Sequence, residues 1–192
     1  MPFNFPILLT WLRVALIPLV VGVYYLPVTW LSPFEQNLSA TLIFIVAAIT
    51  DWLDGFLARR WNQTSAFGAF LDPVADKLMV AGALLVLIQL NRVDAVIAFI
   101  IIGRVITISA LREWMAQIGA SKSVAVSSLG KIKTAAQMIA IPMLLYYDPV
   151  IDNIDTAFWG KQLLFIAAVL TVWSMFYYLK KAWPLIKEKE LE

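Results

Sequence analysis

Apolar residues gather in six stretches along the chain, each close to the length that a helix needs to cross a bilayer. About 20 mostly apolar residues span the hydrocarbon core. The stretches run over 7–25, 38–59, 70–90, 95–115, 132–147 and 159–179, with turn-forming residues between them. We therefore predict an all-α, polytopic membrane protein with six transmembrane helices that form a single integral membrane domain over residues 1–192.

Composition supports this prediction and narrows the chemistry. Hydrophobic residues make up 61% of the 192 residues and charged residues only 15%, too few to surround a soluble core of this size. Histidine and cysteine are both absent, which excludes imidazole bases, thiolate nucleophiles and structural zinc. Any metal must therefore be held by oxygen. The net charge of +2 argues against a nucleic-acid partner.

The distribution of basic residues predicts an orientation. With six spans both chain termini lie on one side, and lysine and arginine in connecting segments favour the cytoplasmic side. The opposite side holds Arg92 and Lys161. The side expected to be cytoplasmic holds Arg59, Arg60, Arg112, Lys122, Lys131, Lys180, Lys181, Lys187 and Lys189.

Four aspartates lie at a similar depth in two neighbouring spans. Asp51 and Asp54 fall near the end of the second span, and Asp72 and Asp76 near the start of the third. The two spans are antiparallel, so both pairs lie roughly 8 to 15 Å below the same surface. The spacings i, i+3 and i, i+4 put each pair on one helix face. The four carboxylates are therefore expected to converge.

Such a cluster needs neutralisation, because each ionised acid near a bilayer centre is disfavoured by about 2.5 to 3.5 kcal/mol. One reading is a structural network of ion pairs with Arg59, Arg60 and Lys77. A second is protonation, as in a proton or cation pathway. A third is a pair of divalent cations, whose charges would balance four carboxylates. All-oxygen ligation would then favour Mg²⁺ or Mn²⁺.

Small residues flank the acids and favour a ligand that lies against the backbone. Gly55 follows Asp54, Gly68 precedes Asp72 by one turn, and Ala58 continues the same face of the second span. Close packing of membrane helices is the alternative explanation for such residues. Pro73 is expected to kink the third span or to make it begin afresh.

Residues 51–76 read DWLDGFLARRWNQTSAFGAFLDPVAD, which fills every position of D-x2-D-G-x2-A-R-x8-G-x3-D-x3-D. This segment resembles the signature of the CDP-alcohol phosphotransferase family. The segments NFPILLTWLR, ISALREWM and SVAVSSLGKIKTAAQM extend the resemblance over nearly the whole chain, towards bacterial members that act on glycerol 3-phosphate. The chain departs from that pattern at Val105, where we expect an acid after Arg104.

The resemblance implies a homodimeric enzyme of the bacterial cytoplasmic (inner) membrane, with its active site facing the cytoplasm. It would transfer the phosphatidyl group of CDP-diacylglycerol to glycerol 3-phosphate and release CMP. Two Mg²⁺ or Mn²⁺ ions would be held by Asp51, Asp54, Asp72 and Asp76, with Asp76 also the general base. The CDP-lipid would lie against Asp54, Gly55, Ala58, Arg59 and Gly68.

A water-soluble, doubly charged acceptor needs cations on the same side of the membrane. The candidates for its phosphate are Arg104, Arg112, Lys131 and Lys133. Arg104 lies inside a span, where a charge is by default functional, and its alternative role is pairing with the aspartates. The two lysines could equally snorkel to the interface. Arg13, near the start of the first span, is interpreted as an interface anchor.

Two kinds of alternative stay open. The same chemistry could use serine, inositol phosphate or phosphatidylglycerol as acceptor, because the aspartate motif does not select the alcohol. The four acids could instead form the ion site of a divalent-cation or proton-coupled carrier. A carrier needs such a site to be reached from both faces in turn, near the membrane midplane.

Overall fold

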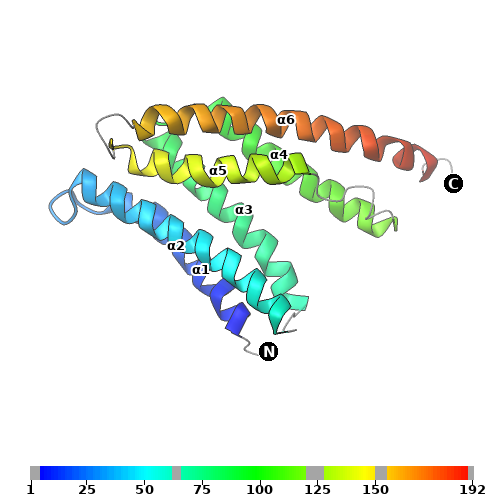
Figure 1. Cartoon of the computed structure of the whole chain (residues 1–192), viewed down its shortest axis with the longest axis horizontal. Helices are drawn as coiled ribbons and strands as arrows, with labels where there is room; N and C mark the ends of the chain where they lie inside the picture. Colours follow the sequence, from blue (N-terminus) through cyan, green and yellow to red (C-terminus); the bar gives the residue numbers. More distant parts are fainter. Residues whose placement is uncertain (1–4, 62–65, 120–127, 150–154, 190–192) are drawn as a thin grey trace.

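The computed structural model describes residues 5–61, 66–119, 128–149 and 155–189. Each of the six predicted spans corresponds to an α-helix, which confirms the all-α prediction (Figure 1). A short 3-10 helix, η1, follows the first of them. The elements are α1 (Phe5–Gly22), η1 (Val23–Tyr25), α2 (Pro33–Arg60), α3 (Ala66–Gln89), α4 (Ala95–Gln117), α5 (Ser128–Tyr146) and α6 (Thr156–Lys189).

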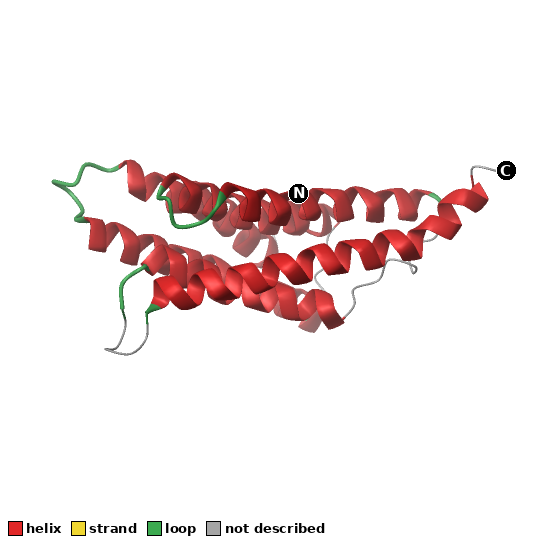
Figure 2. Cartoon of the chain, turned by 90° about the horizontal axis from the view of Figure 1, so that it is seen from above, coloured by secondary structure: helices red, strands yellow, loops and turns green. Residues whose placement is uncertain are grey.

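The helices form two groups that we call the first arm (α1, α2 and α3) and the second arm (α4, α5 and α6). Within the first arm α1 packs against α2 and α3, and within the second arm α6 packs against α5 and α4. Contacts of α2 with α5 and of α3 with α4 join the arms. The arms converge at one end, the closed end, and diverge toward the other, the open end, where the N-terminus lies (Figure 1). Seen from above, all described elements are helices joined by loops (Figure 2).

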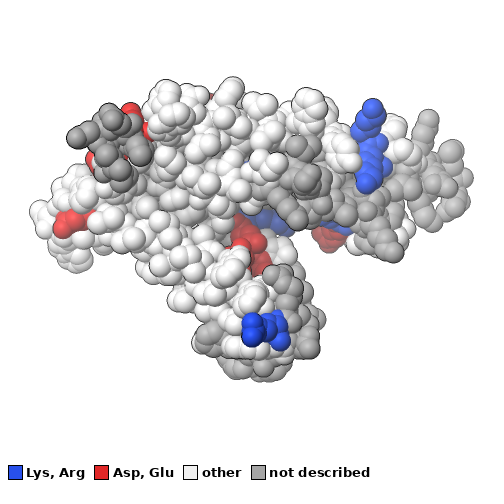
Figure 3. Space-filling view, in the orientation of Figure 1, with Lys and Arg blue, Asp and Glu red and all other residues white. Residues whose placement is uncertain are grey.

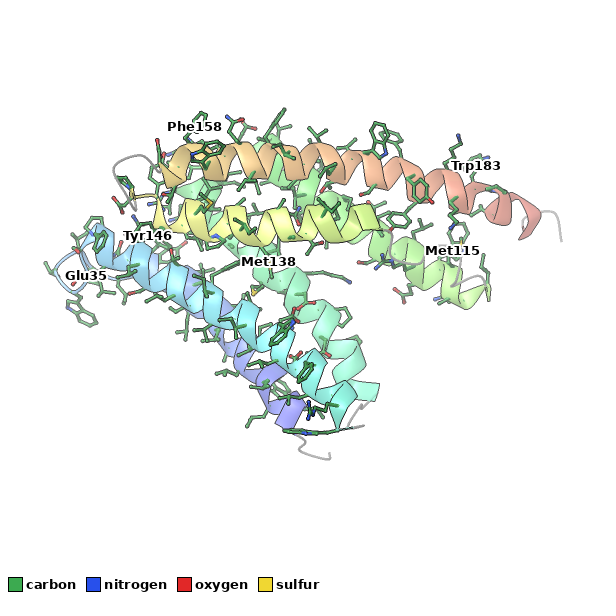
Figure 4. All side chains as sticks on the ribbon, viewed as in Figure 1. Glu35, Met115, Met138, Tyr146, Phe158 and Trp183 are labelled. Carbon is green, nitrogen blue, oxygen red and sulfur yellow. The ribbon has the colours of Figure 1, made fainter. Side chains whose placement is uncertain are left out.

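Labelled side chains mark the two ends of the molecule. Glu35 at the start of α2, Tyr146 at the end of α5 and Phe158 at the start of α6 all lie toward the closed end (Figure 4). Met115 of α4 and Trp183 of α6 lie toward the opposite end. Figure 1 shows that α3, like α5, begins away from the closed end and runs toward it.

The largest differences from the predicted spans lie at the start of α2 and at the end of α6. A capping box starts α2 at Pro33: Ser32 Oγ accepts a hydrogen bond from the Glu35 backbone N–H (3.3 Å), and Glu35 Oε2 accepts one from the Ser32 backbone N–H (2.7 Å). At the other end of the chain, α6 continues through Pro184 to Lys189, well past residue 179.

Helix α3 excludes one of the two outcomes expected for Pro73, a helix that begins afresh there. It does not begin afresh at this residue but runs unbroken from Ala66 to Gln89, with Pro73 inside it. Proline removes one backbone hydrogen bond of the helix. Packing of α3 against α1 on the same segment supplies the compensating contacts, since Thr10 and Arg13 of α1 bind Asp72 and Asp76 on either side of Pro73.

The exposed surface is that of a membrane protein. Among the described residues, four helices are long and apolar enough to cross a membrane: Ile7–Tyr25, Pro33–Ala58, Ala95–Gln117 and Thr156–Pro184. Ile132–Tyr146 is a shorter apolar helix. Large apolar side chains point outward from these helices, such as Phe99 (76% exposed) and Trp173 (67% exposed). Exposure on this scale indicates lipid as the surrounding solvent.

Arg92, in the connection between α3 and α4, ties several elements together at the closed end. Its Nη1 donates to the backbone carbonyls of Leu144 (2.9 Å) and Leu145 (2.6 Å), at the last turn of α5. Its Nη2 donates to Asn37 Oδ1 of α2 (2.7 Å). These bonds satisfy helix-end carbonyls that have no partner within α5 itself. Arg92 therefore links the first arm to the second.

Candidate active site

Three of the four aspartates converge on one arginine of α1. Arg13 Nη1 lies 2.8 Å from Asp51 Oδ1 and 2.6 Å from Asp76 Oδ1, and Arg13 Nη2 forms an ion pair with Asp54 Oδ2. The Arg13 side chain is completely buried. Asp54 is 4% exposed, whereas Asp51 and Asp76 keep 33% and 46% of their side-chain surface open.

The fourth aspartate is held by the residue one turn before this arginine. Thr10 Oγ1 lies 2.8 Å from Asp72 Oδ1 and 3.4 Å from Asp54 Oδ2. Thr10 and Arg13 stand three residues apart in α1, so they lie on one face of that helix. This face meets α2 and α3 where the two aspartate pairs lie. The predicted convergence of the four carboxylates is therefore confirmed, with α1 as its third wall.

The position of Arg13 corrects the interpretation of this residue as an interface anchor. An anchor would reach outward to the lipid headgroups, but the guanidinium turns inward because three carboxylates attract it. Within the described ranges, the ion pairs of the four aspartates all run to Arg13, and none runs to Arg60 or Lys77. Arg60 lies instead over the ring of Phe56, at 6.0 Å from its centroid.

The donor set of this cluster fits hard divalent cations. The four carboxylates offer only oxygen ligands, which Mg²⁺ and Mn²⁺ prefer. One guanidinium supplies a single positive charge against four carboxylates, so the cluster retains an excess of negative charge. In the described part of the chain, no three acids are arranged around a common point as metal ligands. Arg13 occupies the centre of the cluster instead.

The residues predicted to face the CDP-lipid lie beside the aspartates. Gly55 and Ala58, on α2, are half-buried, and Gly68, in the first turn of α3, is buried. They follow Asp54 on α2 and precede Asp72 on α3, at the open end of the first arm. The side chain of Arg59 lies outside the described residues.

A cavity of about 270 Å³ lies between the two arms and contains Asp76. Its walls come from α3, α4 and α5, and both acidic and basic side chains are visible in the recess between the arms (Figure 3). The cavity therefore brings the predicted base together with three of the predicted phosphate-binding cations. The lining includes Asp76, Arg104, Arg112, Lys133 and Gln137. The side chain of Lys131 lies outside the described residues.

The three described cations differ in burial. Lys133 is buried (3% exposed), Arg104 is half-buried and Arg112 is exposed, with its guanidinium over the ring of Tyr178. Arg104 does not pair with the aspartates: Nη2 lies 3.5 Å from Ser174 Oγ, and Nε has no hydrogen-bond partner among the described residues. Val105, the departure noted in the sequence, leaves no acid beside it. Arg104 thus keeps donor capacity toward the cavity.

These features define an acidic cluster joined to a basic pocket, within a helical protein that has the apolar surface of a membrane protein. The sequence pattern of the CDP-alcohol phosphatidyltransferase family matches residues 3–173, and the chain belongs to this family.

Similar proteins include those called CDP-diacylglycerol--glycerol-3-phosphate 3-phosphatidyltransferase from Escherichia coli K12, Escherichia coli O157:H7 and Shigella flexneri serotype 5b. Each is 56% identical to this chain over 184 residues, which cover 95% of this chain and 96% of the relative.

Besides Arg13, two site residues were not predicted from the sequence, Thr10 and Gln137. Each carried a usable signal. Thr10 stands one turn from Arg13, and Gln137 stands one turn from Lys133 in an otherwise apolar segment. A polar residue one turn from a charge inside a span shares its face and therefore its surroundings.

Proposed function

We propose that this chain transfers the phosphatidyl group of CDP-diacylglycerol to glycerol 3-phosphate, giving phosphatidylglycerophosphate and CMP. The observation that carries the proposal is the cavity that joins Asp76 to Arg104, Arg112 and Lys133. It puts a carboxylate able to take a proton beside cations able to hold a phosphate. The high identity to relatives that carry this activity in their name supports the same acceptor.

In this proposal Asp51, Asp54, Asp72 and Asp76 hold two Mg²⁺ or Mn²⁺ ions. When bound, such ions neutralise diphosphate oxygens and stabilise a departing phosphate. Arg13 must then share the carboxylates with the ions or withdraw from between them. Thr10 keeps Asp72 and Asp54 oriented through its hydroxyl.

Proton removal from the attacking hydroxyl falls to Asp76. A chain without histidine or cysteine leaves a carboxylate as its ordinary general base. Asp76 keeps 46% of its side-chain surface exposed and faces the cavity, whereas Asp54 is buried. Arg104, Arg112 and Lys133 hold the acceptor phosphate, and Gly55, Ala58, Arg59 and Gly68 line the CDP-lipid, with Asp54 at its side.

We propose further that all six helices cross the bacterial cytoplasmic membrane as one domain, with the open end toward the cytoplasm. In this arrangement α1 separates Asp72 and Asp76, in the first half of α3, from the lipid, because Thr10 and Arg13 bind these two carboxylates. Both substrates can reach an active site at that surface, the lipid sideways and the acceptor from water. The homodimer implied by the family resemblance stays a prediction, which crosslinking in membranes would test.

Purified protein in detergent, supplied with CDP-diacylglycerol and Mg²⁺, tests the proposal through release of CMP. Glycerol 3-phosphate is expected to support release, and serine, inositol phosphate and phosphatidylglycerol are not. Chelation of divalent ions should stop release, and fresh Mg²⁺ should restore it. Preference for another alcohol would contradict the acceptor, and release that survives chelation would contradict the metal site.

A further inference from the structure

Gln137 brings an unpaired polar group into the cavity between the arms. Its side chain is 4% exposed, and its Nε2 has no hydrogen-bond partner in the described part of the chain. The residue lines the same cavity as Asp76 and Lys133. Buried polar groups of native proteins are nearly always hydrogen-bonded, so one that lacks a protein partner points to a bound molecule.

The place of Gln137 in α5 relates it to the phosphate-binding cations. Lys133 and Gln137 stand four residues apart and share one face of the helix. Because α5 runs from the open end toward the closed end, Gln137 lies about 6 Å further along the helix axis than Lys133. Asp76 contributes to the same cavity from α3. A molecule whose phosphate is held by Lys133 can therefore extend past both Gln137 and Asp76.

The acceptor in the proposed reaction has one polar group for which the site described so far provides no partner. Its phosphate goes to the cations and its attacking hydroxyl to Asp76. The hydroxyl on its middle carbon lies between the two. A hydroxyl both donates and accepts hydrogen bonds, and a glutamine carboxamide can serve as acceptor through its oxygen or as donor through its nitrogen.

We propose that Gln137 hydrogen-bonds the middle hydroxyl of the acceptor and makes the enzyme select phosphorylated alcohols that carry it. This inference rests on the proposed function and identifies a residue that determines which acceptor the enzyme uses. A site built to hydrogen-bond a hydroxyl discriminates strongly against an analogue without it, because the buried polar group is then left unpaired. Gln137 acts as a specificity-determining residue, while Asp76 and the cations do the same work for both compounds.

The test compares glycerol 3-phosphate with 3-hydroxypropyl phosphate, which lacks only the middle hydroxyl. CMP release gives kcat/KM for each acceptor, with CDP-diacylglycerol and Mg²⁺ saturating. The unmodified protein should prefer glycerol 3-phosphate. Gln137→Leu should lower kcat/KM for glycerol 3-phosphate by about 10- to 100-fold. It should leave the value for the analogue within about threefold, so that the preference is lost.

The melting temperature provides a second measurement, because it would fall if the role of Gln137 were only structural. Leucine removes a buried unpaired donor, so the melting temperature of Gln137→Leu without substrate should equal or exceed that of the unmodified protein. Gln162→Leu, at an exposed position of α6, is the matched control and should change neither kcat/KM value.

Equal losses for both acceptors, or a marked fall in melting temperature, would overturn the role of Gln137. So would an unmodified protein that uses both acceptors equally well. In each of these cases CMP release with glycerol 3-phosphate by the unmodified protein still supports the proposed function. Only its absence would contradict that function.

Discussion

Arg13 and the aspartates around it depend on one another. A completely buried guanidinium is costly without anionic partners, and buried carboxylates are costly without a cation. Nη1 and Nη2 together reach Asp51, Asp54 and Asp76, which come from two different helices. Arg13 therefore holds the ends of α2 and α3 together when no other cation is bound.

Replacing Arg13 by alanine should destabilise the protein most when divalent ions are absent. Removal of one partner from a buried ion pair typically costs about 3 to 5 kcal/mol, because the remaining charges stay buried without compensation. The melting temperature in detergent should fall sharply in the presence of chelator. Added Mg²⁺ should raise it by more than it raises that of the unmodified protein, since the ions would replace the lost charge.

Arg60→Ala is the control, because Arg60 is exposed and forms no ion pair with the four aspartates. It should leave the response of the melting temperature to Mg²⁺ unchanged. A response in Arg13→Ala no larger than that of the control would show that divalent ions do not share the carboxylates with Arg13.

Asp76→Asn should abolish turnover and leave binding of CDP-diacylglycerol largely intact. Asparagine keeps the size of the side chain but does not accept a proton, and loss of a general base commonly lowers rates by about 100- to 10,000-fold. CMP release measures the rate, and calorimetric titration with the CDP-lipid measures binding. Equal losses of rate and binding would argue against a base role. Asp94→Asn, at the N-cap of α4, is the control, because asparagine caps helices equally well.

The sequence reveals the aspartate cluster more readily than its partner. Spacings of three and four residues determine that each pair shares a face, and the short connection determines that the pairs share a depth. No spacing connects Arg13 to Asp54, which are 41 residues apart in the chain. The rule that a charge inside a span is functional predicts a role for Arg104 and applies equally to Arg13.

At the scale of elements, the contact between α5 and α6 depends on Gly160. A Cβ atom added there would lie 2.8 Å from Leu144 Cγ and 3.3 Å from Met143 Cβ, closer than carbon atoms normally approach. Small residues at such positions let membrane helices pack tightly. Leu144 is also one of the residues whose carbonyl binds Arg92, so the contact lies at the closed end of the molecule.

Gly160→Ala should lower stability by about 1 to 3 kcal/mol, the usual cost of overpacking a filled interface. Gly103→Ala is the matched control, because no atom lies within 4 Å of the added Cβ there and alanine favours the helix. Melting temperatures in detergent measure both. A loss of the same size in the two variants would contradict tight packing at Gly160.

Helix ends are harder to predict than helix centres, for local reasons. Ser32 and Glu35 form a capping box that begins α2 before its apolar stretch, since capping depends on hydrogen bonds and not on hydropathy. At Pro73, in contrast, the local signal does not determine the structure. Local preference indicates a break, but contacts of Asp72 and Asp76 with α1 keep α3 continuous. Tertiary contacts decide where local signals are weak or opposed.

At the scale of the whole molecule, hydropathy predicts the number of helices but not their grouping. Six apolar stretches give six helices, and the basic residues predict which ends of these helices face the cytoplasm. The division into two arms depends on which apolar faces fit one another, and nearly all such faces are made of the same few residue types. The cavity between the arms was therefore not predictable, although three of its cations were.

The predicted orientation can be tested on intact cells because the chain contains no cysteine. Thr29→Cys, in the exposed connection before α2, should react with a membrane-impermeant maleimide added outside. Lys181→Cys, at an exposed position of α6, should react only after the membrane is opened. The reverse pattern would place the aspartates at the outer surface and contradict a cytoplasmic active site.

The bonds of Arg92 fasten the two arms to each other at the closed end. They join α2, α5 and the connection between α3 and α4, while Asp76 on α3 and the cations on α4 and α5 face the same cavity from different arms. A change in the angle between the arms would therefore alter the distance between that aspartate and those cations.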